Sequence, residues 1–179
     1  MNRYISVLLL TFTVLMVSCS SPRDREASKI KKLEDQLKGQ DASPDKQKLD
    51  ELLNLYIGFV DKFPADTASP SYLYNAVSLC IGTNNGEKAM KLIDRSINEY
   101  SQSSKLPEII FLKAYVYENL LNNLGEAAST YRDFISRFPD NELADDAQAA
   151  INNLGKSPEE LVREFEAKAA AEKNAATVK

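Results

Sequence analysis

The sequence contains no histidine and no tryptophan among its 179 residues. Histidine is the commonest general base and the commonest metal ligand in proteins, so its absence weighs against enzymatic activity. The sequence also lacks a Gly-rich phosphate-binding loop and any spacing typical of metal ligands. We therefore expect no catalytic residues, no bound metal and no cofactor.

Cysteine is almost as scarce, because the chain has only Cys19 and Cys80. Two cysteines do not make a disulfide framework, and Cys19 lies at an expected processing site, which leaves Cys80 alone. No histidine is present to activate Cys80 as a nucleophile. Since an isolated cysteine on an apolar helix face is usually a small buried side chain, we expect Cys80 to lie in the core.

Concentrated positive charge is missing as well. The net charge is −4, and the densest basic stretch is Lys29, Lys31 and Lys32. Nucleic-acid binding requires a basic face, so we do not expect a nucleic-acid partner. Hydrophobic residues make up 44% and charged residues 27% of the chain, as in ordinary globular proteins. The length fits one domain with a short appendage.

The first eighteen residues have the pattern of a secretory signal peptide. Arg3 supplies a positive start, and residues 5–17 form an apolar run. A membrane-spanning helix needs roughly 20 such residues, so this run is too short to remain in a membrane. Its length is instead typical of the hydrophobic region of a cleaved signal, and we assign residues 1–18 to that signal.

The end of this run resembles the bacterial lipobox, in which a small residue precedes a cysteine that is acylated and becomes the mature N-terminus. Ser18 and Cys19 match the motif, whereas Met16 stands where Leu is usual. The resemblance implies that Cys19 carries two or three acyl chains, which are enough for durable anchoring. Ser20, in place of the Asp that tends to retain lipoproteins at the inner membrane, favours the outer membrane. An ordinary cleaved signal peptide is the alternative.

We interpret residues 19–43 as the lipidated cysteine followed by a tether. This segment has few large apolar residues, and Ile30, Leu33 and Leu37 form a narrow helical stripe within it. Two heptads are too few for a stable coiled coil. We expect a loosely helical tether, with two alternatives, that the stripe docks on the remaining helices or pairs with a partner.

From residue 43 onwards, helix boundaries recur regularly and no segment alternates as a strand would. Ser-Pro pairs at 43–44, 69–70 and 157–158 place an N-cap hydroxyl before a proline at the first helical position. Three turns, at 84–86, 122–125 and 152–155, contain the Asn and Gly residues that tolerate a left-handed backbone at a helix end. The predicted helices are 44–63, 70–82, 87–100, 107–121, 126–138, 142–153 and 158–172.

The helices recur with a period of about 38 residues. Small residues align at two places, Ala76 with Ala114 and Ala89 with Ala127, and Ile93 aligns with Tyr131. The helix ends align at Phe63-Pro64, Tyr100-Ser101 and Phe138-Pro139. This pattern resembles the tetratricopeptide repeat, although that repeat is shorter and closes on Pro where this chain has Ser101. Residues 128–150 also resemble repeats of outer-membrane assembly lipoproteins and Tol-Pal accessory proteins.

The resemblance implies an all-α fold, a right-handed helical solenoid of about three repeats. We place this repeat domain at residues 44–165 and expect a polar C-terminal tail at 166–179, since Ala- and Lys-rich sequence has little to bury. In the tetratricopeptide family the first helix of each repeat lines a concave groove. The positions of this chain that carry over to the groove are Leu73, Val77, Phe111, Tyr115, Glu118 and Asn119.

An apolar and partly aromatic groove would suit the amphipathic helix of a protein partner. The alternative is that these side chains pack against neighbouring helices. We therefore expect a lipid-anchored adaptor or scaffold of the bacterial cell envelope that faces the periplasm and binds a protein partner.

The other class of function is an envelope enzyme that acts on cell-wall material through carboxylates alone. The chain has one acidic cluster, which consists of Asp140, Glu142, Asp145 and Asp146. That cluster surrounds a helix start, where carboxylates are favoured by the helix dipole, and it lacks the spacing of a calcium-binding loop. The binding function is therefore the preferred interpretation.

Overall fold

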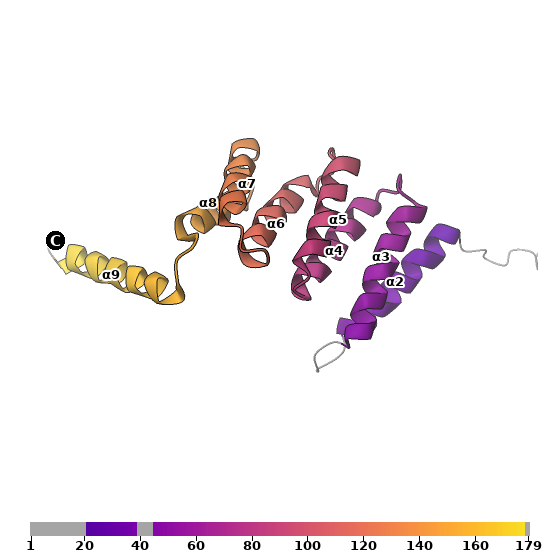
Figure 1. Cartoon of the computed structure of the whole chain (residues 1–179), viewed down its shortest axis with the longest axis horizontal. Coiled ribbons are helices and arrows are strands. Elements are labelled where there is room, and N and C mark those ends of the chain that lie inside the picture. The colour runs from indigo at the N-terminus through magenta and orange to yellow at the C-terminus, as the bar shows by residue number, and fades with distance from the viewer. Residues whose placement is uncertain (1–20, 39–44, 178–179) are drawn as a thin grey trace, which may run out of the picture. The chain divides into compact units, whose positions relative to one another are not determined.

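The computed structural model describes residues 21–38 and 45–177, and every regular element in this part of the chain is a helix. Cys19 and the predicted signal peptide lie outside the described residues. The all-α prediction is confirmed for the part described. The eight helices are α2 (Pro22–Lys38), α3 (Lys46–Lys62), α4 (Ser69–Gly82), α5 (Gly86–Glu99), α6 (Leu106–Asn119), α7 (Leu124–Arg137), α8 (Ala144–Asn153) and α9 (Pro158–Thr177) (Figure 1).

The chain divides into two compact units, residues 1–64 and 65–179. In the first unit α2 packs against α3. Ile30 and Leu33 are buried, and the Tyr56 hydroxyl donates a 2.6 Å hydrogen bond to the Glu34 carboxylate. The prediction of a loose tether is therefore wrong for residues 22–38. The stripe of apolar residues was read correctly as helical, but α3 supplies the partner surface that makes this helix part of the fold.

In the second unit each helix from α4 to α7 packs against the next helix of the chain. The helices α4, α5, α6 and α7 each have 14 residues, and they form two helical hairpins, α4–α5 and α6–α7. Figure 1 shows the two helices of each hairpin running side by side. The core of this unit therefore builds up from neighbours in sequence, as expected where one amphipathic helix cannot bury its apolar face alone.

The turns that precede α4, α6 and α8 are built in the same way. Asp66, Ser103 and Asn141 each accept, through a side-chain oxygen, a hydrogen bond from the backbone N–H two residues later, at 2.8, 3.1 and 2.9 Å. Each residue also accepts, through its carbonyl oxygen, a bond from the first residue of the following helix. These short polar side chains replace the missing intrahelical partners of the first backbone N–H groups.

The turns within the hairpins differ in length. Asn84 and Asn122 have positive φ angles of 57° and 50°, and the next turn has Gly155 at 78°, so the predicted left-handed turn residues are confirmed. Three residues separate α4 from α5, whereas four separate α6 from α7. As a result α4 and α6 begin 37 residues apart, at 69 and 106, while α5 and α7 begin 38 apart, at 86 and 124.

This difference corrects the predicted alignment of Ala76 with Ala114. In the structural register Ala114 corresponds to Val77, and both side chains are fully buried. Ala89 and Ala127 do correspond, at the same place in α5 and α7, and both are fully buried. Small residues at these places let two helix axes approach closely, whereas a bulky side chain would push the axes apart.

The C-terminal segment also differs from its prediction. The helix expected at 158–172 begins at Pro158 as predicted, but α9 continues to Thr177, so the polar tail at 166–179 is helical over most of its length. Alanine, glutamate and lysine are strong helix formers even where little is buried. The predicted capping box is present, because Ser157 Oγ accepts from the Glu160 N–H while the Glu160 carboxylate accepts from the Ser157 N–H.

Gly86 provides a test of the close approach between α5 and the end of α6. A methyl group added at Gly86 would lie 2.9 Å from the Leu120 Cβ and 3.0 Å from Leu121 Cδ2. We expect Gly86→Ala to lower the free energy of unfolding by about 1–3 kcal/mol, the usual cost of overpacking. Thermal unfolding followed by circular dichroism measures this. Gly82→Ala is the control, since nothing lies within 4 Å of its added methyl. Equal melting temperatures would contradict the close approach.

Candidate binding surface

Of the six predicted groove residues, Leu73 and Val77 are fully buried within α4. They belong to the core, so for these two residues the groove prediction is wrong. The physical reason is the shorter turn after α4, which displaces the register of this helix by one residue relative to α6. A shift of one residue rotates a side chain by about 100° around the helix axis, which is enough to move it from a surface to the core.

The α4 residues that correspond to Phe111 and Tyr115 are Tyr74 and Ser78. Tyr74 is half-buried and Ser78 is exposed. The Lys105 ammonium group lies 5.1 Å from the centre of the Tyr74 ring, within the range of a cation–π interaction. The sequence did not predict that Tyr74 and Ser78 lie at these positions. The signal that could have identified them is that Asn85 and Asn123 lie at unequal distances from the ends of the preceding helices.

Lys105 also pairs with Glu108, at 2.7 Å between Nζ and Oε1. The hydrogen bond that the Lys105 ammonium group donates to Glu108, together with the charge of that carboxylate, raises the pKa of the ammonium group. Lys105 therefore remains protonated at neutral pH, with its charge shared between a carboxylate and an aromatic ring. The surroundings of the Tyr74 ring on this side are consequently polar.

Phe111 is half-buried and packs against the core of the α6–α7 hairpin. Its ring centre lies 5.5 Å from that of Tyr131 and 5.7 Å from that of Phe134, both in edge-on arrangements. Edge-to-face pairs of this kind stabilise a fold beyond the apolar area that they bury. Phe111 is thus chiefly a packing residue, and only the remainder of its surface is available to a partner.

Glu118 likewise has a structural role. The Tyr131 hydroxyl donates a 2.9 Å hydrogen bond to Glu118 Oε2, which joins α7 to the last turn of α6. Burial raises the pKa of the Tyr131 phenol well above its ordinary value, and the hydrogen bond to Glu118 raises it further. The phenol therefore stays protonated and keeps donating to the carboxylate.

Tyr115 and Asn119 are the two predicted groove residues that the structure leaves exposed. Tyr115 retains 37% of its surface in solvent. The Asn119 amide donates a 3.1 Å hydrogen bond to the Tyr115 carbonyl oxygen, one turn earlier in α6. We define the α4/α6 surface as Tyr74, Ser78, Phe111, Tyr115 and Asn119, the described residues at equivalent, accessible positions of these two helices.

Other side chains with reactive groups are accounted for by packing. Cys80 is fully buried, as expected, and burial raises the pKa of its thiol, which disfavours the reactive thiolate. Within the described ranges, no group of three or more His, Cys, Asp or Glu side chains is arranged to hold a metal ion. Across those same residues no helix is both long and apolar enough to cross a membrane.

Comparison with known proteins gives no match to the chain, either among protein-family models or among curated proteins.

Phe111 and Tyr115 should respond differently to truncation. We expect Phe111→Ala to cost about 3 kcal/mol, the lower end of the range for buried phenylalanine, because the variant loses both ring contacts. Tyr115→Ala should cost less than about 1 kcal/mol, since an exposed side chain contributes little to the fold. Chemical denaturation of both variants gives the two values. A similar loss in both would place Tyr115 in the core.

Proposed function

We propose that the chain is a membrane-anchored, tetratricopeptide-like helical scaffold that binds a protein partner in the bacterial cell envelope. Three features support the repeat assignment. The hairpins consist of helices of equal length, alanines occupy matching buried positions in α5 and α7, and the same side-chain capped turn precedes α4, α6 and α8. A right-handed solenoid of about three repeats follows from this assignment.

The observation that carries the binding function is the exposed ring of Tyr115 on α6. Tyr74 lies in α4 at the place that corresponds to Phe111, and Ser78 and Asn119, one turn after Tyr74 and Tyr115, carry hydrogen-bonding groups. Tyrosine presents a large apolar face at a low entropic cost, which is why it is enriched at the energetic centres of interfaces. The most suitable ligand is an amphipathic helix, whose apolar side chains recur at the same spacing as the helix turns.

The membrane attachment rests on the sequence. Ser18 and Cys19 resemble the processing site of bacterial lipoproteins, and Ser20 favours the outer membrane with the folded part facing the periplasm. Binding is preferred to catalysis because two ionisable side chains near the α4/α6 surface, Glu118 and Lys105, already form hydrogen bonds or ion pairs with other residues of the fold. Glu118 accepts from Tyr131, and Lys105 pairs with Glu108, so both pairs stabilise helices.

Partner capture tests the binding function. A photo-crosslinking amino acid at position 115, in cells of the native bacterium, should link the chain to a discrete partner. Tyr115→Ser should weaken the recovered complex by tenfold or more, as expected for a central aromatic contact, without lowering the melting temperature appreciably. Leu121→Ser is the matched control, because Leu121 has the same exposed fraction of 37% but lies in the turn after α6. Equal losses in both variants would contradict a site at Tyr115.

Processing at Cys19 is tested by mass spectrometry of the mature protein. We expect a chain that begins at Cys19 and carries the added mass of a diacylglycerol and one further acyl chain. Cys19→Ser should accumulate as an unprocessed precursor, since the thioether requires the cysteine sulfur. A wild-type N-terminus elsewhere, or a mass without lipid, would rule out the anchor while leaving the binding function open.

A further inference from the structure

The solvent-exposed face of α2 is basic in a chain whose net charge is −4. The helix has six basic and four acidic residues, and their distribution is uneven. Glu34 and Glu26 are directed towards α3, where Glu34 accepts from Tyr56 and Glu26 pairs with Lys62 at 3.2 Å. The exposed charges of α2 are Arg25, Lys29, Lys31, Lys32 and Lys38 against Asp24 and Asp35. Lys29 also pairs with Glu26, at 3.1 Å, so packing on α3 leaves Arg25, Lys31, Lys32 and Lys38 facing solvent with Asp24 and Asp35 as the exposed carboxylates.

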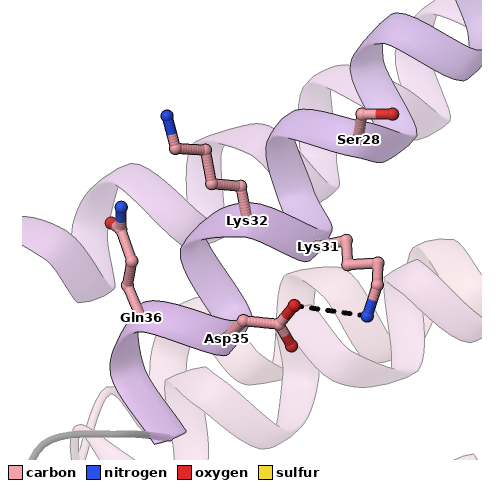
Figure 2. A pocket seen from close by; sticks show the side chains of 5 residues that line it. All are labelled: Ser28, Lys31, Lys32, Asp35 and Gln36. Atoms are coloured by element: carbon pink, nitrogen blue, oxygen red, sulfur yellow. Dashed lines mark ion pairs between the residues drawn. The ribbon is translucent and has the colours of Figure 1, made fainter.

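A shallow hollow of about 520 Å³ lies on this face and is lined by Ser28, Lys31, Lys32, Asp35 and Gln36 (Figure 2). Lys31 and Asp35 form an ion pair of 3.2 Å, and in Figure 2 the side chains of Lys32 and Gln36 extend from the helix on the other side of the hollow. Four of the five residues carry hydrogen-bond donors, a hydroxyl, an amide and two ammonium groups. The hollow is therefore suited to an anionic group with several acceptor oxygens.

We propose that this basic face of α2 binds the anionic headgroups of phospholipids at the membrane in which Cys19 is anchored. The inference rests on the proposed lipid anchor, because the anchor brings α2 to the membrane surface. Only Ser20 and Ser21 separate Cys19 from Pro22, where α2 begins, so even an extended connection spans about 10 Å.

The short connection between Cys19 and Pro22 also constrains how α2 lies relative to the membrane. Lys32 is ten residues beyond Pro22, about 15 Å further along the helix axis. If α2 stood upright on the membrane, Lys32 would lie well beyond the Debye length of about 8 Å and its attraction to the headgroups would be screened. If α2 lies along the surface, the hollow and the flanking lysines reach the phosphate groups. A lipid chain combined with a basic patch is a known way to obtain stable and oriented attachment.

An environment-sensitive fluorophore attached to Ser28→Cys in the full chain tests the proposal. Cys80 is fully buried and the Cys19 sulfur is acylated in the proposed mature chain, so labelling is directed to the introduced thiol. The protein is reconstituted on phosphatidylcholine vesicles that contain increasing fractions of phosphatidylglycerol. We expect the emission to shift towards that of an apolar environment as phosphatidylglycerol increases, and 0.5 M NaCl to reverse the shift. Inorganic phosphate in solution should not produce it. A label on Ser129→Cys in α7 should not respond.

Charge variants provide the decisive comparison. Lys31→Gln with Lys32→Gln should lower the ratio of membrane-contacting to free label by about 25-fold, since each basic residue near an anionic surface contributes about fivefold. Lys46→Gln with Lys91→Gln makes the same change in net charge elsewhere and should leave the ratio unchanged. An unresponsive label, an equal response on neutral vesicles, or equal effects of the two double variants would overturn the proposal. The mass of the mature chain tests the anchor separately, because it shows before labelling whether the Cys19 sulfur carries lipid.

Discussion

The close approach of neighbouring helices at small buried residues is the constraint on which the rest of the second unit depends. Ala89 and Ala127 occupy matching positions early in α5 and α7, Ala114 lies opposite in α6, and all three are fully buried. Because interiors are packed at the density of organic crystals, these positions cannot expand without moving a helix axis. They fix which face of each helix points inward, and therefore which side chains of α4 and α6 remain on the surface.

Helix boundaries were largely predictable from the sequence because their signals are local. Proline at the start of α4 and α6, and Asn at left-handed turn positions, specify helix edges through their own backbone preferences. The rotation of a helix is a different kind of property. Here it depends on the length of the turn that follows the helix, and a single additional residue between α6 and α7 was enough to misplace Leu73 and Val77, whereas Tyr115 is exposed.

The structural roles of α2 and of Glu118 were missed for another reason. The helix α2 has only a narrow apolar stripe, which alone does not stabilise a short helix in water. Its order comes from α3, a contact that sequence periodicity does not reveal. The role of Glu118 was missed in the same way, since nothing near Glu118 in the sequence indicates that Tyr131 on another helix donates to its carboxylate. Contacts between residues that are distant in the sequence were therefore the part of the fold that required the structure.

The same kind of tyrosine–glutamate hydrogen bond occurs within each of the two units. Tyr56 and Tyr131 each lie seven residues before a phenylalanine that ends a helix, Phe63 or Phe138, and each donates to a glutamate of the preceding helix. The hairpin of α2 and α3 thus resembles that of α6 and α7 in its central polar contact. At the corresponding place in α5 stands Ile93, which is fully buried and needs no acceptor. If α2 is the first helix of such a hairpin, the folded part of the chain begins at α2, two residues after Ser20. The proposed anchor at Cys19 would then restrain the orientation of α2 as well as its position, because so short a connection limits how far the helix can rotate away from a surface.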